Sequence, residues 1–568
     1  MKKILLFSFF LLLATSVAAQ DIPQHISYTR IYDFLDELAN EGLIELNSAI
    51  KPYSREFISK KLLEAQDKKD ELNIRQRKET AFFLNEYALE QDKLPEDFPR
   101  SWKTDCLQVG LIQPAAHYRD DNFRARITPL LGMHIWHNNK GNITKRWFGA
   151  EFQGMIGKNL SVYGSLRDNS MTKIDGDMLS KSSYLNDQPG YQYKEATYGG
   201  DYSDSRGGIK YAWKTGSVGL VKDNIVWGDN YHGSNIISGR APSFPMLTLN
   251  LKPAKWFELN YFHGWLVSNI KDSSYYYIGQ DDKKEYRMAN KFIAANMFTF
   301  TPLRNLNLSV GNSIIYGERS PHPAYFIPIA FYKSLDHTLT KGLGTENQNS
   351  QVFFNISSRN IKHLHVFTSV YADEIKFSRF KPDEKQNNPI SYKIGANLTN
   401  FPLENLSFTG EFTHTNIINY KHKIPVLSWT SNDYNLGHYM GDNSRELYLV
   451  LGYKPIRGLD LKIWYANAEK GNEYDYLQSN IKQIISQPVM QDIIWKNNAF
   501  GLNAVYEVFN NGYAVLNIEN SHIQTFEPAS AAIVGEKRMT AQEALDYFTP
   551  AFLQGKNTTI TLGFSFGF

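Results

Sequence analysis

Aromatic, amide and basic residues gather in a few long polar stretches of the chain. Side chains of these kinds together can bind a polar ligand. Trp227, Asn230, Tyr231 and Arg240 lie within one such stretch. An aromatic ring covers the apolar face of a pyranose, whereas amide and charged groups hydrogen-bond its hydroxyl and carboxyl groups. This combination predicts a sugar-binding site in which Arg240 contacts an anionic group by a paired hydrogen bond.

Two further stretches carry similar residues. One contains Trp429, His438 and Arg445, and the other has three consecutive tyrosines at positions 275–277. Arg445 offers the same bidentate geometry to an anionic sugar as Arg240. We therefore name Trp227, Asn230, Tyr231, Arg240, Trp429, His438 and Arg445 as candidate polysaccharide-binding residues.

Signatures of catalysis and metal binding are missing from the sequence. The chain has no G-x-S-x-G, no H-E-x-x-H, no phosphate-binding glycine loop and no EF-hand loop. A single cysteine, Cys106, excludes an intrachain disulfide and a multi-cysteine metal site. We therefore predict a protein that is not an enzyme and that uses no metal and no cofactor.

The balance of charge and hydropathy narrows the class of protein. Lys and Arg total 61 and Asp and Glu total 58, so the net charge of +3 gives no reason to expect a nucleic-acid partner. The mean hydropathy of −0.42 excludes a chain with many membrane-spanning helices. Aromatic residues make up 14% of the chain, which is a high content.

The first residues resemble a secretory signal peptide. Lys2 and Lys3 precede an apolar run over 4–14, and small residues at 17–19 precede Gln20. The run is too short for a spanning helix. We predict a signal peptide over residues 1–19, so that the mature protein leaves the cytoplasm; an N-terminal anchor is the alternative.

A small helical part is expected next. Apolar residues recur at helical spacing over 31–38, 57–63 and 82–89. Ser54 is a good N-cap, and Glu56 is favoured by the helix dipole. We place a periplasmic helical domain at residues 20–105.

The rest of the chain alternates with a period of two. In the last segment apolar residues occupy one face and small or polar residues the other, and the apolar set is Ile560, Leu562, Phe564, Phe566 and Phe568. The same alternation recurs in segment after segment, separated in turn by short connections and long polar loops. Outer-membrane barrels have lipid-facing apolar residues, polar lumen residues, short periplasmic turns and long external loops.

The number of strands follows from parity. About nineteen segments look like strands, beginning at 106–117, whereas a barrel with both ends in the periplasm needs an even number. Removing segment 106–117 leaves about 18 strands, starting near Arg126, with about 16 or about 20 as the alternatives. We therefore predict a mainly β protein: a transmembrane antiparallel barrel of about 18 strands within residues 106–568, preceded by the small periplasmic α-helical domain.

Five stretches resemble the Wzi capsule-assembly family. They are IVWGDN at 225–230 with RAPSFPMLTL at 240–249, LANEGLI at 38–44 with PYSRE at 52–56, and YNLGHYMGDNSR at 434–445. The resemblance implies an outer-membrane barrel with a periplasmic helical bundle and a lectin-like, non-catalytic role in holding capsular or related polysaccharide at the cell surface. The W-G loop departs from the family form, since Asp229 and Tyr231 replace the usual proline and second tryptophan.

Structural roles for the candidate residues stay open. Rings near strand ends also form the aromatic girdles of membrane barrels. Arg240 and Arg445 could instead pair with lumen carboxylates such as Glu411 and hold loops inside the barrel.

Three functions remain as hypotheses. The first is binding or anchoring of capsular polysaccharide or exopolysaccharide at the cell surface, with outer-membrane lipid or lipopolysaccharide as a further partner. The second is an outer-membrane channel, or an accessory subunit of an envelope complex for secretion, gliding or uptake. The third, a hydrolase or glycan-modifying enzyme, is least favoured because its motifs are missing.

Overall fold

The computed structural model describes residues 21–96, 98–174, 194–340, 348–381 and 383–567. The predicted signal peptide and Phe568 lie outside these residues. Among the described residues, no helix is both long enough and apolar enough to span a bilayer.

Three helices form a small bundle at the start of the described chain. They are α2 (Thr29–Asn40), α3 (Arg55–Asp67) and α4 (Ile74–Glu86), followed by the short η1 (Leu89–Gln91). Ser54 caps α3 by accepting from the Phe57 amide at 3.1 Å, and Asn73 with Gln76 forms a capping box on α4. The buried side chains of Leu35, Leu38 and Leu62 are part of the core between the helices.

A short meander links the helices to the barrel. It consists of β2 (Arg100–Lys103), β3 (Leu107–Gly110) and β4 (Ala115–Arg119). The strand β5 pairs with β4 through residues 124–127 and with β28 through residues 131–137. Most of segment 106–117 therefore extends the sheet at one end of the barrel and lies outside the ring of spanning strands.

The ring closes with 18 antiparallel strands, which confirms the predicted fold class. The first nine strands are β5 (Phe123–Asn138), β6 (Gly141–Ile156), β7 (Leu160–Thr172), β9 (Gly199–Trp213), β10 (Gly216–Asp223), β12 (Phe244–Ala254), β13 (Phe257–Leu266), β16 (Lys291–Leu303) and β17 (Leu306–Tyr316). The others are β18 (Gln348–Ile361), β19 (Leu364–Ala372), β20 (Ile390–Thr399), β21 (Leu406–Thr415), β24 (Ser444–Tyr453), β25 (Leu459–Gly471), β26 (Ile493–Phe509), β27 (Gly512–Thr525) and β28 (Lys556–Phe566).

The two faces of the wall have opposite character. Leu562 and Phe564 of β28 are 59% and 51% exposed, while Thr561, just before them, is buried. The register puts Leu516 opposite Leu562 and Asn517 opposite Thr561, so the alternation continues into β27. Exposed apolar side chains therefore cover the outside and polar side chains line the inside, as a bilayer requires.

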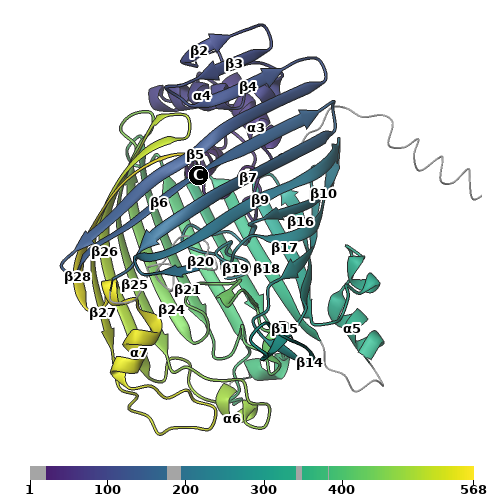
Figure 1. The fold of residues 1–568 in the computed structure, drawn as a ribbon, viewed down its shortest axis with the longest axis vertical. Helices are drawn as coiled ribbons and strands as arrows, with labels where there is room; N and C mark the ends of the chain where they lie inside the picture. The colour runs from purple at the N-terminus through teal and green to yellow at the C-terminus, as the bar shows by residue number, and fades with distance from the viewer. Residues whose placement is uncertain (1–20, 97, 175–193, 341–347, 382, 568) are drawn as a thin grey trace, which may run out of the picture.

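The two ends of the barrel differ in the length of their connections. Tight turns join the strands at the upper end in Figure 1, where α3 and α4 also lie, and long loops occupy the lower end. The long loops carry β8 (Lys194–Ala196), β11 (Val226–Trp227), β14 (Lys271–Ile278), β15 (Lys284–Met288), β22 (Thr430–Ser431), β23 (Tyr434–Asn435), η3 (Pro323–Phe326), η4 (Phe377–Phe380), η5 (Pro425–Leu427), η6 (Ala551–Leu553), α5 (Tyr332–Thr340), α6 (Ile481–Ile485) and α7 (Ala541–Phe548). We call these the turn end and the loop end.

Candidate functional site

The loop of residues 224–243, between β10 and β12, folds into the lumen. Its short strand β11 pairs with β1 (Ile50–Lys51) of the N-terminal part, with Trp227 opposite Ile50. The Trp227 ring is 3% exposed and meets the ring of Phe262 edge-on at 5.1 Å between centroids. A loop that starts at the loop end thus reaches across the barrel and touches the helical part. We call it the first plug loop.

A buried carboxylate holds the tip of the first plug loop. Glu411 on β21 accepts the Tyr231 amide at 2.5 Å and the His232 amide at 2.8 Å. Lys393 on β20 lies 3.0 Å from the same carboxylate, and both side chains are nearly inaccessible. Two backbone donors and one ammonium together compensate the cost of burying this charge.

Tyr231 connects this tip to the helical part. Its hydroxyl donates to Asp36 on α2 and lies 2.8 Å from Nδ1 of His365. Burial acts to raise the pKa of Asp36, but the Arg359 guanidinium and other partners outweigh it and lower this pKa to about 2. Asp36 is therefore charged at neutral pH and is a strong acceptor for the tyrosine.

A second loop, residues 416–443, packs on the first. The Trp429 indole donates to the Ile236 carbonyl at 2.9 Å, and the Tyr420 hydroxyl donates to the Asn235 carbonyl at 2.7 Å. The Ser238 amide donates to the Leu436 carbonyl at 2.7 Å. We call this segment the second plug loop. The W-G stretch at 225–230 and the stretch at 434–445 thus lie in loops that pack on each other, although about 200 residues separate them in the chain.

A polar cluster around one carboxylate joins the two loops. Glu446 on β24 lies 3.3 Å from Nε2 of His438 and 3.5 Å from Nε2 of His232. Tyr439 donates to the same carboxylate, and the Arg240 guanidinium stands over the Tyr439 ring at 5.2 Å. His438 and Arg240, named from the sequence, therefore meet at one place through partners that the sequence did not reveal.

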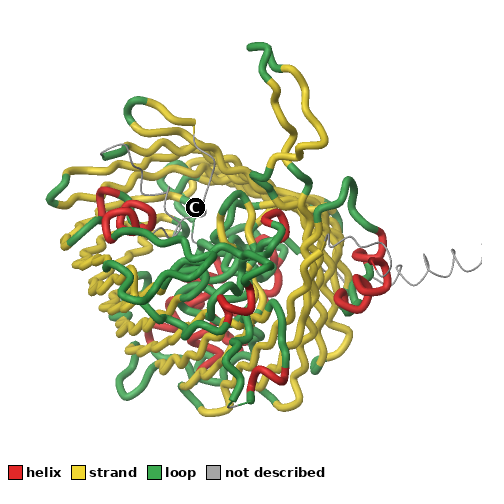
Figure 2. Tube along the Cα trace, turned by 90° about the horizontal axis from the view of Figure 1, so that it is seen from below, coloured by secondary structure: helices red, strands yellow, loops and turns green. Residues whose placement is uncertain are grey.

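Apolar residues fill the lumen around these loops. Trp227, Ile236 and Trp429 belong to one buried cluster with inward-facing strand residues such as Phe262 and Phe353. Figure 2, seen from the loop end, shows loops and helices across the inside of the ring. The described residues thus give this lumen a packed core, whereas a barrel of this size would otherwise enclose an aqueous channel.

The structure places the seven candidate residues in three settings. Trp227 and Trp429 are buried in the apolar core, so their rings hold the plug and offer no face to a sugar. Asn230 donates to the Gly228 carbonyl at 2.8 Å within its own turn, while Tyr231, Arg240 and His438 make the loop contacts described above.

Arg445 lies apart from the other candidates. It is on the outer face of β24, 43% exposed, with its Nε 2.6 Å from Glu469 on β25. Glu469 also pairs with Lys496 of β26 at 2.7 Å, so the three charges form a row across the outer wall. Arg445 therefore does not pair with a lumen carboxylate.

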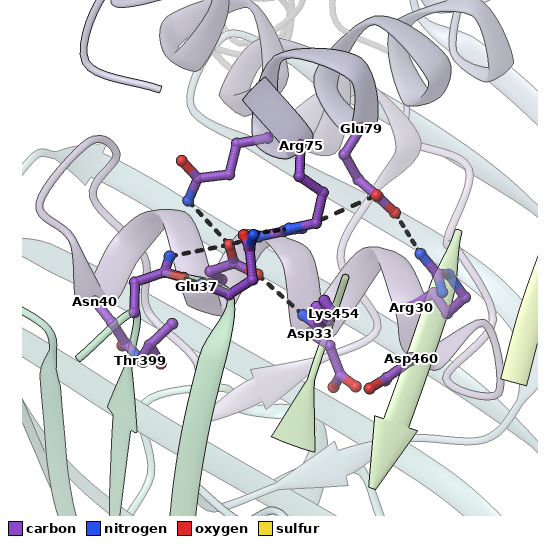
Figure 3. Close-up of polar contacts among 12 residues, drawn as sticks. Arg30, Asp33, Glu37, Asn40, Arg75, Glu79, Thr399, Lys454 and Asp460 are labelled. Atoms are coloured by element: carbon purple, nitrogen blue, oxygen red, sulfur yellow. Dashed lines mark hydrogen bonds and ion pairs between the residues drawn. The ribbon is translucent and has the colours of Figure 1, made fainter. Parts of the chain in front are cut away.

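A second polar network attaches the helical part to the turn end of the barrel (Figure 3). Glu37 on α2 pairs with Arg75 and, at 3.0 Å, with Lys454 between β24 and β25. The side-chain amide of Asn40 donates to the side chains of two residues on β20, Asn397 at 2.8 Å and Thr399 at 3.1 Å. Contacts of this kind connect both α2 and α4 with the wall.

Two neighbouring carboxyl groups on α2 have opposite protonation tendencies. Burial acts to raise the pKa of Glu37, but Arg75 and Lys454 lower it to about 2. Burial and the nearby Glu37 charge raise the pKa of Glu41 to about 7, although Asn400 and Gln76 donate hydrogen bonds to it. Glu41 is thus the member of this pair that titrates near neutral pH.

The comparisons with known proteins agree with this architecture. The family model of the capsule assembly protein Wzi matches residues 149–531, more than half of the chain. The chain belongs to the Wzi family. This confirms the family resemblance seen in the sequence and makes the protein an outer-membrane β-barrel.

The fold is also similar to solved structures. A structure described as Wzi, an outer-membrane protein involved in group 1 capsule assembly in Escherichia coli and a carbohydrate-binding β-barrel, matches with a TM-score of 0.55 and 10% identity. The match covers 97% of this chain and 100% of that one. Pseudomonas aeruginosa OccD3 matches with a TM-score of 0.40 and 10% identity over 78% of this chain and 90% of its own. The search of curated proteins found no match.

Replacing Glu411 tests the anchor of this Wzi-family plug. We expect Glu411→Ala to destabilise the protein by about 3–5 kcal/mol, because Lys393 would be left buried without its charge partner. Urea unfolding in lipid vesicles measures this loss. Glu404→Ala, which removes an exposed carboxylate from the turn before the same strand, should change stability by less than about 0.5 kcal/mol. Equal effects of the two substitutions would show that Glu411 is not the anchor.

The raised pKa of Glu41 predicts a pH dependence of the docked helix. Because the folded state holds the proton more tightly than the unfolded state, the stability of α2 should fall as pH rises from about 4.5 to about 7. Glu41→Gln should remove this fall, so that the variant and the native chain are alike at pH 4.5 and the variant is more stable at pH 8. Hydrogen exchange of the α2 amides measures the difference. Glu64→Gln, on the exposed side of α3, should leave the pH profile as it is; an unchanged profile in Glu41→Gln would refute the assignment.

Proposed function

We propose that this protein binds polysaccharide at its loop end and holds it at the cell surface, without catalysis. Membership of the capsule-assembly family is the observation that carries the proposal. The packed lumen supports it, because a sealed barrel is suited to present loops rather than to conduct solutes. The solved relative described as a carbohydrate-binding barrel is consistent with such a role.

The orientation follows from the two ends of the barrel. Outer-membrane barrels place short turns in the periplasm and long loops outside the cell. The helical part lies at the turn end (Figure 1), and we therefore propose that it occupies the periplasm. The loop end then faces the surface glycan.

The candidate residues divide between two proposed roles. Arg240 and Arg445 are the partly exposed cations among them, and we assign them direct contact with acidic groups of the polysaccharide. Trp227, Asn230, Tyr231, Trp429 and His438 form the plug and fix the conformation of the loops that carry the binding surface.

A role beside an envelope complex has one observation in its favour. A cavity of about 770 Å³ lies at the turn end between α3 and the wall, and lysines such as Lys214 and Lys255 line it together with carboxylates such as Glu56 and Asp67. A polar segment of a periplasmic partner would fit this mixed lining. Such a partner is compatible with polysaccharide binding at the opposite end.

Deletion of the gene tests the proposed function. The deletion strain should make as much polysaccharide as the parent but release most of it into the medium, and the native gene should restore attachment. Complementation with Arg240→Ala/Arg445→Ala should restore less attachment, because two cations are lost. Arg304→Ala is the matched control, since this exposed arginine also pairs with a carboxylate, Glu45 at 3.1 Å, but at the turn end.

The readout is the ratio of cell-bound to released polysaccharide. Full retention of the glycan by the deletion strain would overturn the proposal. Equal attachment with the double variant and with the control would overturn only the assignment of the two arginines.

A further inference from the structure

The strands β14 and β15 form a hairpin that is separate from the barrel. They pair only with each other, as a two-stranded sheet between β13 and β16. The hairpin lies at the loop end in Figure 1 and projects beyond the ring of strands in Figure 2. Most of its side chains are exposed on both faces.

Three consecutive tyrosines on β14 stand in solvent. About half of each ring is exposed, so these side chains are not part of a hydrophobic core; the exposed fractions are 54% for Tyr275, 50% for Tyr276 and 53% for Tyr277. The register pairs Tyr276 with Tyr286 and Tyr277 with Glu285, so Tyr275 and Tyr277 share one face. Large exposed aromatic groups gathered on one element mark a binding surface rather than a packing surface.

Each ring has a polar group beside it. The Arg287 guanidinium stands over the Tyr275 ring at 5.0 Å and pairs with Asp272 at 3.1 Å. The Tyr277 hydroxyl donates to Glu285 at 2.5 Å. The face of Tyr275 and Tyr277 thus offers two flat apolar rings bordered by fixed donors and acceptors, the pattern that suits sugar rings and their hydroxyl groups.

Contacts on the opposite face, around Tyr276, hold the two strands together before any ligand arrives. The Lys284 ammonium lies 4.6 Å from the Tyr276 centroid, and the Tyr276 and Tyr286 rings are 6.1 Å apart. Cross-strand contacts of this kind stabilise a hairpin that has no other sheet to pair with. Tyrosine gives large contact area at a low cost in conformational entropy, so a rigid arm loses little on binding.

The charge of the hairpin indicates the kind of glycan. Four basic residues face four acidic ones, namely Lys271, Lys283, Lys284 and Arg287 against Asp272, Asp281, Asp282 and Glu285. A balanced surface attracts a polyanion weakly. Its complement is a stretch of uncharged, hydroxyl-rich sugar residues within the glycan.

The hairpin is continuous with the plug. The Asn432 amide donates to the Val267 carbonyl at 3.0 Å, and the Val267 amide donates to the Ser431 hydroxyl at 3.2 Å. Asn269 donates to Asp433. These contacts fix the base of the arm to the second plug loop, which carries Trp429 and His438.

We propose that this hairpin is a polysaccharide-binding arm, whose Tyr275 and Tyr277 rings stack on uncharged sugar residues of the surface glycan. The inference rests on the proposed function and names the part of the loop end that grips the chain. The two rings are two residues apart, about 6.6 Å along the strand. They therefore contact neighbouring sugars of one chain, while Arg287 and Glu285 bind hydroxyl groups.

Binding by the full-length protein in detergent tests the arm. The probe is the surface polysaccharide sheared from cells that lack this protein, immobilised on a sensor. We expect Tyr275→Ala/Tyr277→Ala to weaken binding about tenfold, since each ring contributes a stacking contact. Tyr275→Phe/Tyr277→Phe keeps both rings and should retain most of the affinity.

Two controls separate the arm from general effects. Tyr547→Ala removes a tyrosine of α7 that is 53% exposed and lies under Lys537 at 3.8 Å, and it should bind like the native protein. The double alanine variant should lose about the same factor in affinity at 0.5 M salt as at low salt, because salt does not screen stacking. Migration of every variant as a folded barrel in unheated gels checks the fold.

The outcomes discriminate between the two proposals. Native affinity in the double alanine variant would overturn the arm and leave the proposed function standing. No binding by the native protein would overturn both. If the double variant keeps polysaccharide but loses binding to vesicles that contain lipopolysaccharide, the tyrosines are membrane-interface anchors and the arm is refuted.

Discussion

A buried ion pair inside a wide barrel is the contact on which the rest of the site depends. Eighteen strands enclose more space than their own side chains fill, so something else must occupy the lumen. Here the first plug loop does so, and Glu411 with Lys393 fixes its tip. The second plug loop packs on the first, and the base of the hairpin is bonded to the second plug loop.

The plug joins the two ends of the molecule. Tyr231 donates to Asp36 on α2, and Trp227 sits opposite Ile50, so one loop contacts both the N-terminal part and the loop-end segments. The helical part is in turn attached to the wall through Glu37 and Lys454. The helices therefore help to close the barrel and support the loops, besides occupying one of its ends.

The sequence predicted the barrel better than it predicted the site. Period-two alternation and turn chemistry are local, so the strands, the approximate strand number and the long loops could be read from residues such as those of β28. The roles of Trp227 and Trp429 could not, because both rings are buried by side chains of other strands, such as Phe353 of β18. The direction of Arg445 could be read from its neighbours: it continues the outward face of Leu447 and Leu449, so period-two alternation points it toward Glu469 and away from the lumen.

Contact partners from distant parts of the chain could not be found from the sequence. Nothing near Glu446 in the chain marks it as the partner of His232 and His438, and the Asp36–Tyr231 contact joins residues from opposite ends of the fold. Family resemblance pointed to the two plug loops but not to their contacts. Only the closed ring brings these groups together.

Conductance of the purified protein in planar bilayers tests the central claim that the barrel is sealed by its own loops. The native protein should show no stable stepwise conductance, because the apolar cluster around Trp227 and Trp429 blocks the lumen. Steady single-channel steps of porin size in the native protein would contradict it and would favour a channel.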